Sequence, residues 1–288
     1  MIAVVDSGST KSDWVFLSPE GKEISTNTMG FNPFFHNEAK IASEVISNPV
    51  IQQYAKTVKD VYFYGAGCSD AMRSKIVERG LSHVFENANI VAEHDLLGAA
   101  RALCGNQAGI ACIIGTGSNS CLYDGEKIID NITNLGFLLG DEGSGSYLGK
   151  MLVQGYFYRE MPSDLVRLFE EKYPEGKRTI INKIYTEGAN VYLAAFSNFY
   201  AQHPTHPYLQ QLITKGFIDF LTRHVVKYEN YKMYPVSFVG SVAFYYQDIL
   251  KDCLEKLNLQ FGNIIQKPIQ KLVSYHVSSN EIKQSANQ

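Results

Sequence analysis

Two segments of the chain combine glycine with small hydroxyl residues at the tip of a predicted β-hairpin. Residues 6–11 read Asp-Ser-Gly-Ser-Thr-Lys, and residues 115–118 read Gly-Thr-Gly-Ser. Because glycine has no Cβ, backbone N–H groups at such a tip can approach an anion closely. One tip alone could be an ordinary hairpin turn, but two tips, one in each half of the chain, predict a nucleotide polyphosphate gripped from both sides.

Two common phosphate-binding sequences do not account for these tips. The chain contains no Gly-X-X-X-X-Gly-Lys-Ser/Thr motif, which excludes a Walker-type loop. In a dinucleotide-binding fold the glycines open a helix after a strand, whereas both tips here run into β-rich sequence. The pattern therefore indicates phosphate binding by hairpins.

The hairpins are expected among alternating strands and helices. In the first half the hydrophobic pattern predicts strands at 2–5, 14–17, 24–28, 61–64 and 90–92 and helices at 37–48, 51–57, 70–80 and 95–104. The second half begins at residue 110 and is predicted to carry helices at 145–159, 163–173, 179–185, 191–202, 207–228 and 244–257, with strands at 236–239 and 263–265. Both halves therefore read as α/β.

Composition and charge exclude several classes of protein. A chain of 288 residues suits about two domains, and a net charge of −3 argues against a nucleic-acid-binding protein. No run of 18 apolar residues occurs, and the first residues enter a strand without a basic leader, so we expect no membrane association and a cytoplasmic location. The five cysteines include no Cys-X-X-Cys pair, which argues against a zinc or disulfide framework.

Four segments, in this order, resemble the motifs of one protein family. They are residues 6–14, 115–118, 136–144 and 237–242, of which the third contains Gly-Asp-Glu-Gly-Ser. As a set they are similar to the two phosphate motifs, the segment after the second, and the adenosine motif of the N-acetylglucosamine kinase-like and BadF/BadG-type ATPase group. This group belongs to the sugar kinase/Hsp70/actin superfamily. Ser241 stands where the adenosine motif usually has a second glycine.

The resemblance implies an α/β chain with two ribonuclease H-like domains, the actin-like ATPase fold, and a central cleft. We expect an N-terminal domain at 1–108 and a C-terminal domain with helical insertions at 109–267. Residues 268–288 are expected to pack back onto the first domain, and their polar end, 278–288, to fray. A homodimer is compatible with the resemblance.

The resemblance also implies ATP and Mg²⁺ as cofactors and phosphoryl transfer to a hydroxyl group. Asp6, at the end of the first strand, would organise Mg²⁺, and Asp95 would act as the catalytic base that accepts the hydroxyl proton. An ordinary turn residue is the alternative for Asp6, and a helix N-cap is the alternative for Asp95. The residues expected to bind the nucleotide are Gly8, Ser9, Thr10, Lys11, Gly115, Thr116, Gly117, Gly240 and Ser241.

The acceptor implied by the resemblance is an amino or N-acetylated hexose similar to N-acetylglucosamine. Asp141 could accept two hydroxyl protons at once. Leu135 stands where those kinases have a tryptophan, and Cys68 replaces a hydroxyl residue, so we expect weaker selectivity for the acetamido group. The residues expected to contact the sugar are Asn32, Cys68, Asp95, Thr116, Asn119 and Asp141.

Two other functions fit the same family. An ATPase activator of a reductase or dehydratase would present cysteines to a shared iron–sulfur cluster, and the cysteine spacing does not favour this. A non-catalytic sugar sensor would not need Asp6, Asp95 and Asp141 together. An ATP-dependent kinase of a small-molecule sugar is therefore the leading prediction.

Overall fold

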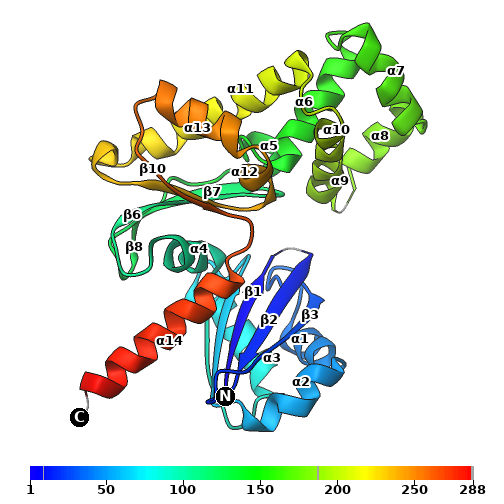
Figure 1. Cartoon of the computed structure of the whole chain (residues 1–288). Helices are drawn as coiled ribbons and strands as arrows, with labels where there is room; N and C mark the ends of the chain where they lie inside the picture. Colours follow the sequence, from blue (N-terminus) through cyan, green and yellow to red (C-terminus); the bar gives the residue numbers. More distant parts are fainter. Residues whose placement is uncertain (9, 187, 287–288) are drawn as a thin grey trace. The chain divides into compact units, whose positions relative to one another are not determined.

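The computed structural model describes residues 1–8, 10–186 and 188–286 (Figure 1). The chain divides into two compact units. Unit 1 comprises residues 1–107, 125–127 and 267–288, and unit 2 comprises residues 108–124 and 128–266. Each unit contains one five-stranded mixed sheet, as expected for an α/β protein.

The sheet of unit 1 has the strand order β3-β2-β1-β4-β5. The first three strands are antiparallel neighbours, whereas β4 and β5 run parallel to β1. The strands are β1 (Ile2–Ser7), β2 (Lys11–Leu17), β3 (Glu23–Met29), β4 (Asp60–Gly65) and β5 (Asn89–His94). The parallel arrangement brings the carboxyl ends of β1, β4 and β5 to one edge of the sheet.

The helices of unit 1 begin at recognisable caps. The side chains of Asn37, Asn48 and Asp70 accept backbone N–H groups at the starts of α1, α2 and α3, and Pro49 is the first residue of α2. The helices are α1 (Glu38–Ile46), α2 (Pro49–Tyr54), the short η1 (Ala55–Thr57), α3 (Ala71–Ser82), α4 (Asp95–Cys104) and α14 (Ile269–Ala286). Helix α14 packs against α4, β1 and β2.

The polar end of this last helix was expected to fray. Helix α14 extends to Ala286, residues 287–288 lie outside the described residues, and the fraying of residues 278–288 stays a prediction.

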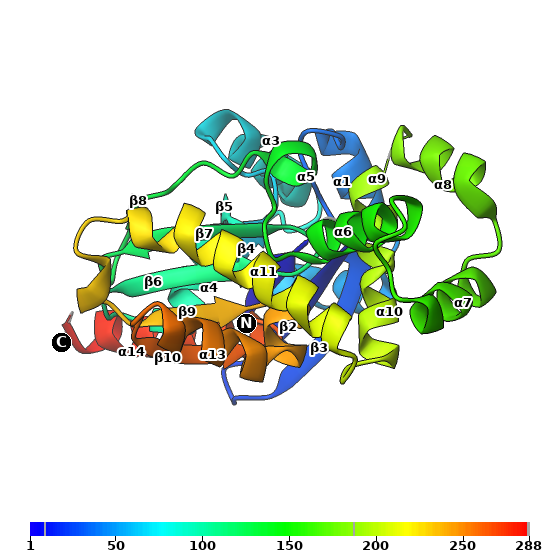
Figure 2. The ribbon, with the colours of Figure 1, turned by 90° about the horizontal axis from the view of Figure 1, so that it is seen from above.

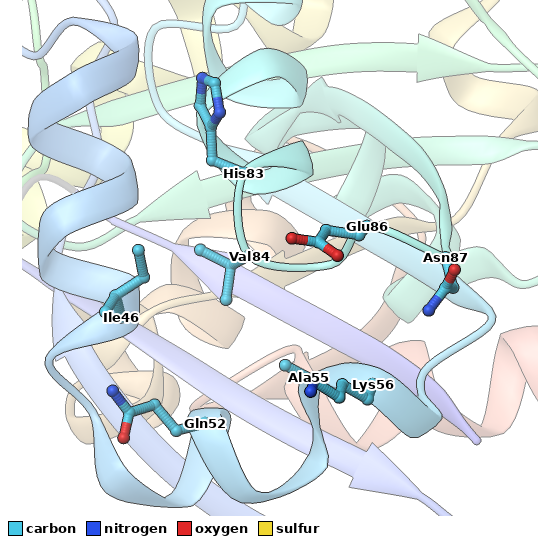
Figure 3. A pocket seen from close by; sticks show the side chains of 8 residues that line it. All are labelled: Ile46, Gln52, Ala55, Lys56, His83, Val84, Glu86 and Asn87. Atoms are coloured by element: carbon cyan, nitrogen blue, oxygen red, sulfur yellow. The ribbon is translucent and has the colours of Figure 1, made fainter.

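Unit 1 also has a surface pocket that is distinct from the candidate site described below (Figure 3). Its volume is about 300 Å³. It is lined by Ile46, Gln52, Ala55, Lys56, His83, Val84, Glu86 and Asn87. Most of these residues come just before β4 or β5 in the chain, so the pocket lies towards the amino ends of these strands.

The sheet of unit 2 has the strand order β10-β9-β6-β7-β8. Strands β6, β7 and β8 are antiparallel neighbours, and β9 and β10 run parallel to β6. The strands are β6 (Gly109–Ile114), β7 (Ser118–Tyr123), β8 (Ile128–Asp130), β9 (Val236–Val239) and β10 (Phe261–Ile265).

Helices form the larger part of unit 2. They are α5 (Gly136–Leu139), α6 (Gly145–Phe157), α7 (Ser163–Lys172), α8 (Gly176–Ile184), α9 (Ala189–Ala195), α10 (Ser197–Gln202), α11 (Pro207–Arg223), η2 (Val225–Lys227), η3 (Tyr231–Met233), α12 (Ser241–Tyr245) and α13 (Gln247–Lys256). Helices α11 and α13 pack side by side on the sheet, and α7 to α10 form a group to one side of it (Figure 2). A single core of buried residues from β6, α6, α11 and α13 joins these layers.

Among the predicted helices of unit 2, those at 191–202, 207–228 and 244–257 are divided or end early in the structure, while those at 145–159, 163–173 and 179–185 differ only by one to three residues at their ends. The helix predicted at 191–202 is divided into α9 and α10 at Phe196. The helix predicted at 244–257 is divided at Tyr246, whose φ of −110° and ψ of 29° interrupt the helical ladder. The helix predicted at 207–228 ends at Arg223 and continues as a 3₁₀ turn. Among the described residues, no helix has the length and apolar character needed to cross a membrane.

Candidate active site

Three strands of unit 1 end side by side and bring the candidate residues of this unit together. Ser7 of β1 is in register with Gly65 of β4, and Gly65 is in register with His94 of β5. The loops that follow these strands therefore start at the same edge. They carry the first hairpin tip, Cys68 and the start of α4.

Asp6 lies just before this edge and is in register with Asp13 on β2. Burial, together with the negative charges of Asp95 and Asp13, raises the pKa of Asp6 to about 7, while Lys267 opposes this shift. A half-buried carboxylate near two other carboxylates is a position where a cation would be stabilised.

Asp13 forms ion pairs with two lysines next to the first hairpin tip. Its carboxylate lies 2.8 Å from Lys11 Nζ and 3.1 Å from Lys267 Nζ. Burial alone would raise the pKa of Asp13, but the hydrogen bonds and charges of both lysines outweigh burial and lower it. At the tip itself the Gly8 N–H donates to Lys11 O over 2.9 Å, Thr10 is exposed, and Ser9 lies outside the described residues.

Asp95 is the first residue of α4, and its neighbour His94 is the N-cap. His94 Nδ1 lies 3.0 Å from the Leu96 N–H and 3.0 Å from Asp95 Oδ1. Nδ1 can accept from Leu96 only without a proton and can pair with Asp95 only with one, so these contacts are alternatives. Burial opposes the protonation of His94, yet the hydrogen bond and charge of Asp95 raise its pKa overall.

The cap alternative for Asp95 therefore fails in this structure. The capping atom belongs to His94, and the Asp95 side chain is partly exposed at 28%.

Asn32 and Cys68 come from neighbouring loops of unit 1. Asn32 Oδ1 accepts the Phe34 N–H over 3.0 Å, and the Asn32 side chain packs against Gly67. Burial, with the charge of Asp95, raises the pKa of the Cys68 thiol to about 12. Cys68 is thus a neutral, buried thiol beside the site, which leaves it a weak hydrogen-bonding group.

Unit 2 gathers its glycine motifs at the carboxyl ends of β6 and β9. Gly240 directly follows β9, has a φ of +125°, and packs on the backbone at Ile114 and Gly115, where a side chain would collide. The Gly145 N–H donates to Gly115 O over 2.8 Å, and the Ser146 N–H donates to Thr116 O over 3.0 Å. The start of α6 therefore fixes the second hairpin tip.

The Asp141 carboxylate lies against this tip. It is 7% exposed and adopts the left-handed conformation, with a φ of 56°. Its Oδ1 accepts the Ser118 N–H over 3.0 Å and the Asn134 side-chain amide over 2.7 Å. A Cβ at Gly117 would lie about 3.0 Å from the carboxylate, so glycine there makes room for it.

The remaining candidate residues of unit 2 are at its surface or beside the tip. Thr116 and Ser241 are exposed, and Ser241 begins α12. Asn119 is half-buried on β7, where its Oδ1 accepts from the Ser120 N–H and from the side chain of Asn131.

The residue after Asp141, Glu142, belongs to a buried ionic cluster. Glu142 is 4% exposed, and its carboxylate lies 3.0 Å from Arg223 Nη1 and 3.2 Å from His224 Nε2 at the end of α11. The two neighbouring acidic residues of the Gly-Asp-Glu-Gly segment therefore contact different parts of unit 2.

Within each unit the structure brings the candidate residues to one end of the sheet. Sequence reasoning missed Asp13, Lys267 and Asn134. Lys267 is separated from Asp13 by 254 positions, so no local pattern could reveal it. Asn134 does carry a signal, because asparagine two residues before a glycine often closes a turn through its own side chain.

Similar folds occur in solved structures of sugar kinases. One is a protein from Chromobacterium violaceum that is provisionally named an N-acetylglucosamine kinase, with 16% identity, a TM-score of 0.67, and coverage of 96% of this chain and 99% of that chain. Another is a ROK family glucokinase from Streptomyces griseus, solved in complex with glucose and AMPPNP, with 15% identity, a TM-score of 0.54, and coverage of 95% and 97%. The chain thus has the two-domain fold of the actin-like ATPases and sugar kinases.

Sequence identity is much higher with a protein from Porphyromonas gingivalis that is also provisionally named an N-acetylglucosamine kinase. Its structure shares 41% identity and a TM-score of 0.90, with coverage of 96% of this chain and 98% of that chain. The chain therefore belongs to the N-acetylglucosamine kinase-like family of ATP-dependent sugar kinases, which confirms the resemblance seen in its motifs. No protein-family model and no curated protein matches it.

Proposed function

We propose that this sugar kinase transfers the γ-phosphoryl group of ATP to a hydroxyl of an amino or N-acetylated hexose similar to N-acetylglucosamine. The observation that carries the proposal is the 41% identity, over 96% of the chain, with the Porphyromonas gingivalis protein that is provisionally named an N-acetylglucosamine kinase. Phosphoryl transfer depends mainly on positioning and on charge neutralisation, and both halves of the candidate site offer groups for these tasks.

Asp95 is proposed as the base. Its carboxylate is partly exposed at the start of α4 and is not used as the helix cap, so it is available to accept a proton from the acceptor hydroxyl. The negative charge of Asp95 contributes to the raised pKa values of both Asp6 and Cys68. This influence supports a position of Asp95 near the residue proposed for the metal and one proposed for the sugar.

Asp6 is proposed to hold Mg²⁺ directly or through water. Mg²⁺ in kinases is commonly held by one or two carboxylates, phosphate oxygens and several waters, and the half-buried carboxylate of Asp6 fits this demand. Among the described residues no group of three or more His, Cys, Asp or Glu side chains is arranged to hold a metal ion. When bound, the ion would neutralise charge on the phosphates.

The nucleotide is proposed to lie on the two hairpin tips and on Gly240 with Ser241. Lys11 is half-exposed beside the first tip, where its charge can reach a terminal phosphate. The residues proposed for the nucleotide are Gly8, Ser9, Thr10, Lys11, Gly115, Thr116, Gly117, Gly240 and Ser241. The residues proposed for the sugar are Asn32, Cys68, Asp95, Thr116, Asn119 and Asp141.

A substrate screen tests the proposal. ADP release by the purified chain would be measured with ATP, Mg²⁺ and either no sugar or N-acetylglucosamine, N-acetylmannosamine, N-acetylmuramic acid, glucosamine or glucose. We expect slow turnover without sugar and strong stimulation by an N-acetylhexosamine. Full turnover without sugar would indicate an ATPase activator, and sugar binding without ADP release would indicate a sensor.

A further inference from the structure

We propose that Asn134 is a positioning residue that holds Asp141 so that only one carboxylate oxygen is offered to the sugar. This inference rests on the proposed sugar-binding role of Asp141. Asn134 lies between β8 and α5, outside the four segments that resemble family motifs, and its side chain contacts Ser118 at the second hairpin tip as well as Asp141.

The whole side-chain amide of Asn134 is used in this task. Its Nδ2 donates to Asp141 Oδ1 over 2.7 Å and also to Ser118 O, and its Oδ1 accepts the Gly136 N–H over 2.7 Å. A primary amide has two N–H donors. Both point at acceptors, and rotating the amide would place its oxygen against them instead, so the contacts fix its orientation.

The same contacts occupy one oxygen of Asp141. Oδ1 accepts from Asn134 and from the Ser118 N–H, which uses its two lone pairs. Among the described residues no hydrogen bond reaches Oδ2. Gly117 covers one side of the carboxylate, since a Cβ there would lie 3.0 Å from Oδ1 and 3.1 Å from Oδ2.

The consequence concerns how the sugar is recognised. Two neighbouring hydroxyls are commonly bound by both oxygens of one carboxylate, and the sequence alone allowed this for Asp141. Because Oδ1 is occupied, we infer that Asp141 recognises one sugar hydroxyl through Oδ2. Asn134 then determines which oxygen faces the substrate, and it also prevents the carboxylate from turning.

The first experiment compares Asn134→Ala, Asn134→Asp and Asp141→Asn in steady-state kinetics with the N-acetylhexosamine that supports turnover. A hydrogen bond to a charged group contributes enough that its loss should raise the sugar KM by about 10- to 100-fold. The KM for ATP should change much less than the sugar KM, because Asn134 contacts the nucleotide tip only through Ser118 O. Asn134→Asp keeps the shape but puts a second carboxylate against Asp141, so its sugar KM should rise further. Asn182→Ala, at an exposed asparagine on α8, is the matched control.

A double-mutant cycle separates positioning from a general structural effect. In the Asp141→Asn background, Asn134→Ala should raise the sugar KM little further, because the carboxylate it positions is gone. Equal effects of Asn134→Ala in both backgrounds would overturn the inference. Melting temperatures of all variants identify any that fail to fold. If Asn134→Ala does not fold, Asn134→Asp replaces it in the comparison of the two backgrounds.

The outcomes also distinguish this inference from the proposed function. If Asp141→Asn raises the sugar KM and Asn134→Ala does not, positioning by Asn134 is wrong while the sugar-binding role of Asp141 stands. If Asp141→Asn has no effect on the sugar KM, positioning by Asn134 and sugar binding by Asp141 are both wrong. Sugar-dependent ADP release by the wild type would still support the proposed kinase function.

Deoxy analogues test the single-oxygen claim. Among the monodeoxy forms of the substrate, each lacking one hydroxyl, only one should be insensitive to Asp141→Asn. If two forms are insensitive, Asp141 binds two hydroxyls and this part of the inference is overturned.

Discussion

Three aspartates at the candidate site have different surroundings. Asp6 is half-buried near two other carboxylates, Asp95 is partly exposed at a helix start, and Asp141 is held by two N–H donors. These surroundings suit a metal ligand, a base and a fixed hydrogen-bond acceptor respectively. The same residue type can therefore serve three tasks in one enzyme.

The role of Asp95 leads to a prediction about turnover. Asp95→Asn should lower kcat by about 10²- to 10⁴-fold, the contribution of general-base catalysis, without changing the affinity for ATP. The melting temperature should stay the same, because His94 provides the helix cap. Kinetics and thermal unfolding of the variant give both values.

The control for Asp95 is another aspartate at a helix start. Asp70 caps α3 through the Arg73 N–H, so Asp70→Ala should lower stability by about 0.5–2 kcal/mol and leave kcat unchanged. Near-normal kcat in Asp95→Asn would show that the base lies elsewhere.

Asp6 should make stability depend on pH. Its pKa rises from the ordinary value of 3.8 to about 7 on folding because of burial and the charges of Asp95 and Asp13. Between these values the folded chain holds a proton that the unfolded chain releases, so the free energy of unfolding falls as pH rises from about 4 to about 7. Asp6→Asn should remove this slope and stabilise the nucleotide-free protein above pH 7, by on the order of 2–4 kcal/mol.

Urea unfolding at several pH values measures this effect, and Asp13→Asn supplies a control of opposite sign. The two lysines lower the pKa of Asp13 despite its burial, so Asp13 contributes stability above its unfolded pKa that is lost at acidic pH. An Asp6→Asn profile parallel to the wild type would contradict the raised pKa of Asp6.

Leu135 bears on sugar selectivity. It is 61% exposed next to α5, where related kinases have a tryptophan, and one apolar contact is worth about 1–3 kcal/mol in discrimination. We expect modest selectivity between N-acetylglucosamine and glucosamine in the wild type. In Leu135→Trp the ratio of kcat/KM for N-acetylglucosamine to kcat/KM for glucosamine should be higher. Leu138→Trp, at a position that is 71% exposed, is the control. A wild-type ratio above about 10⁴ would show that other residues recognise the acetamido group.

At the scale of elements, α14 is attached to unit 1 by a buried histidine. His276 Nε2 lies 2.8 Å from the Tyr64 hydroxyl, and the His276 ring stacks on Tyr62 with centroids 3.7 Å apart. Arg101 donates to the Tyr64 oxygen over 2.8 Å, which leaves the hydroxyl hydrogen for His276. The last helix is therefore held by specific polar contacts as well as by apolar packing.

Removing this histidine should loosen α14. His276→Ala should lower the free energy of unfolding by about 1–3 kcal/mol and increase hydrogen exchange in residues 269–286. Ser274→Ala, at an exposed position on the same helix, should have little effect. Unchanged exchange in His276→Ala would show that apolar packing alone holds the helix.

At the scale of the whole molecule, the residues proposed for each ligand are divided between unit 1 and unit 2. A ligand that binds only the folded state stabilises it by about 2.7 kcal/mol at 100 times its Kd. We expect AMPPNP and the sugar each to raise the melting temperature, and Asp141→Asn to abolish only the shift caused by the sugar. An acyclic polyol at the same concentration controls for general solvent effects, and a sugar shift that persists in Asp141→Asn would argue against its role.

Oligomeric state is a separate property of the whole molecule. The homodimer that the family resemblance allows stays a prediction, which light scattering of the purified chain can decide.

The sequence by itself determined the family, the α/β fold class and the positions of the glycine and aspartate motifs. It could do so because each motif is local: a strand, a tight turn and a few side chains within about ten residues. The same local logic misjudged the limits of some longer helices, such as the one predicted at 244–257, which the backbone conformation of Tyr246 interrupts.

Tertiary structure alone decided which groups surround each motif residue. Lys267 reaches Asp13 across 254 positions, His94 takes the cap that Asp95 could have filled, and Asn134 occupies one oxygen of Asp141. Burial and hydrogen bonding between distant segments depend on how strands and helices pack. For this reason the sequence predicted which residues form the candidate site, while the structure determined how their charges and hydrogen bonds are arranged.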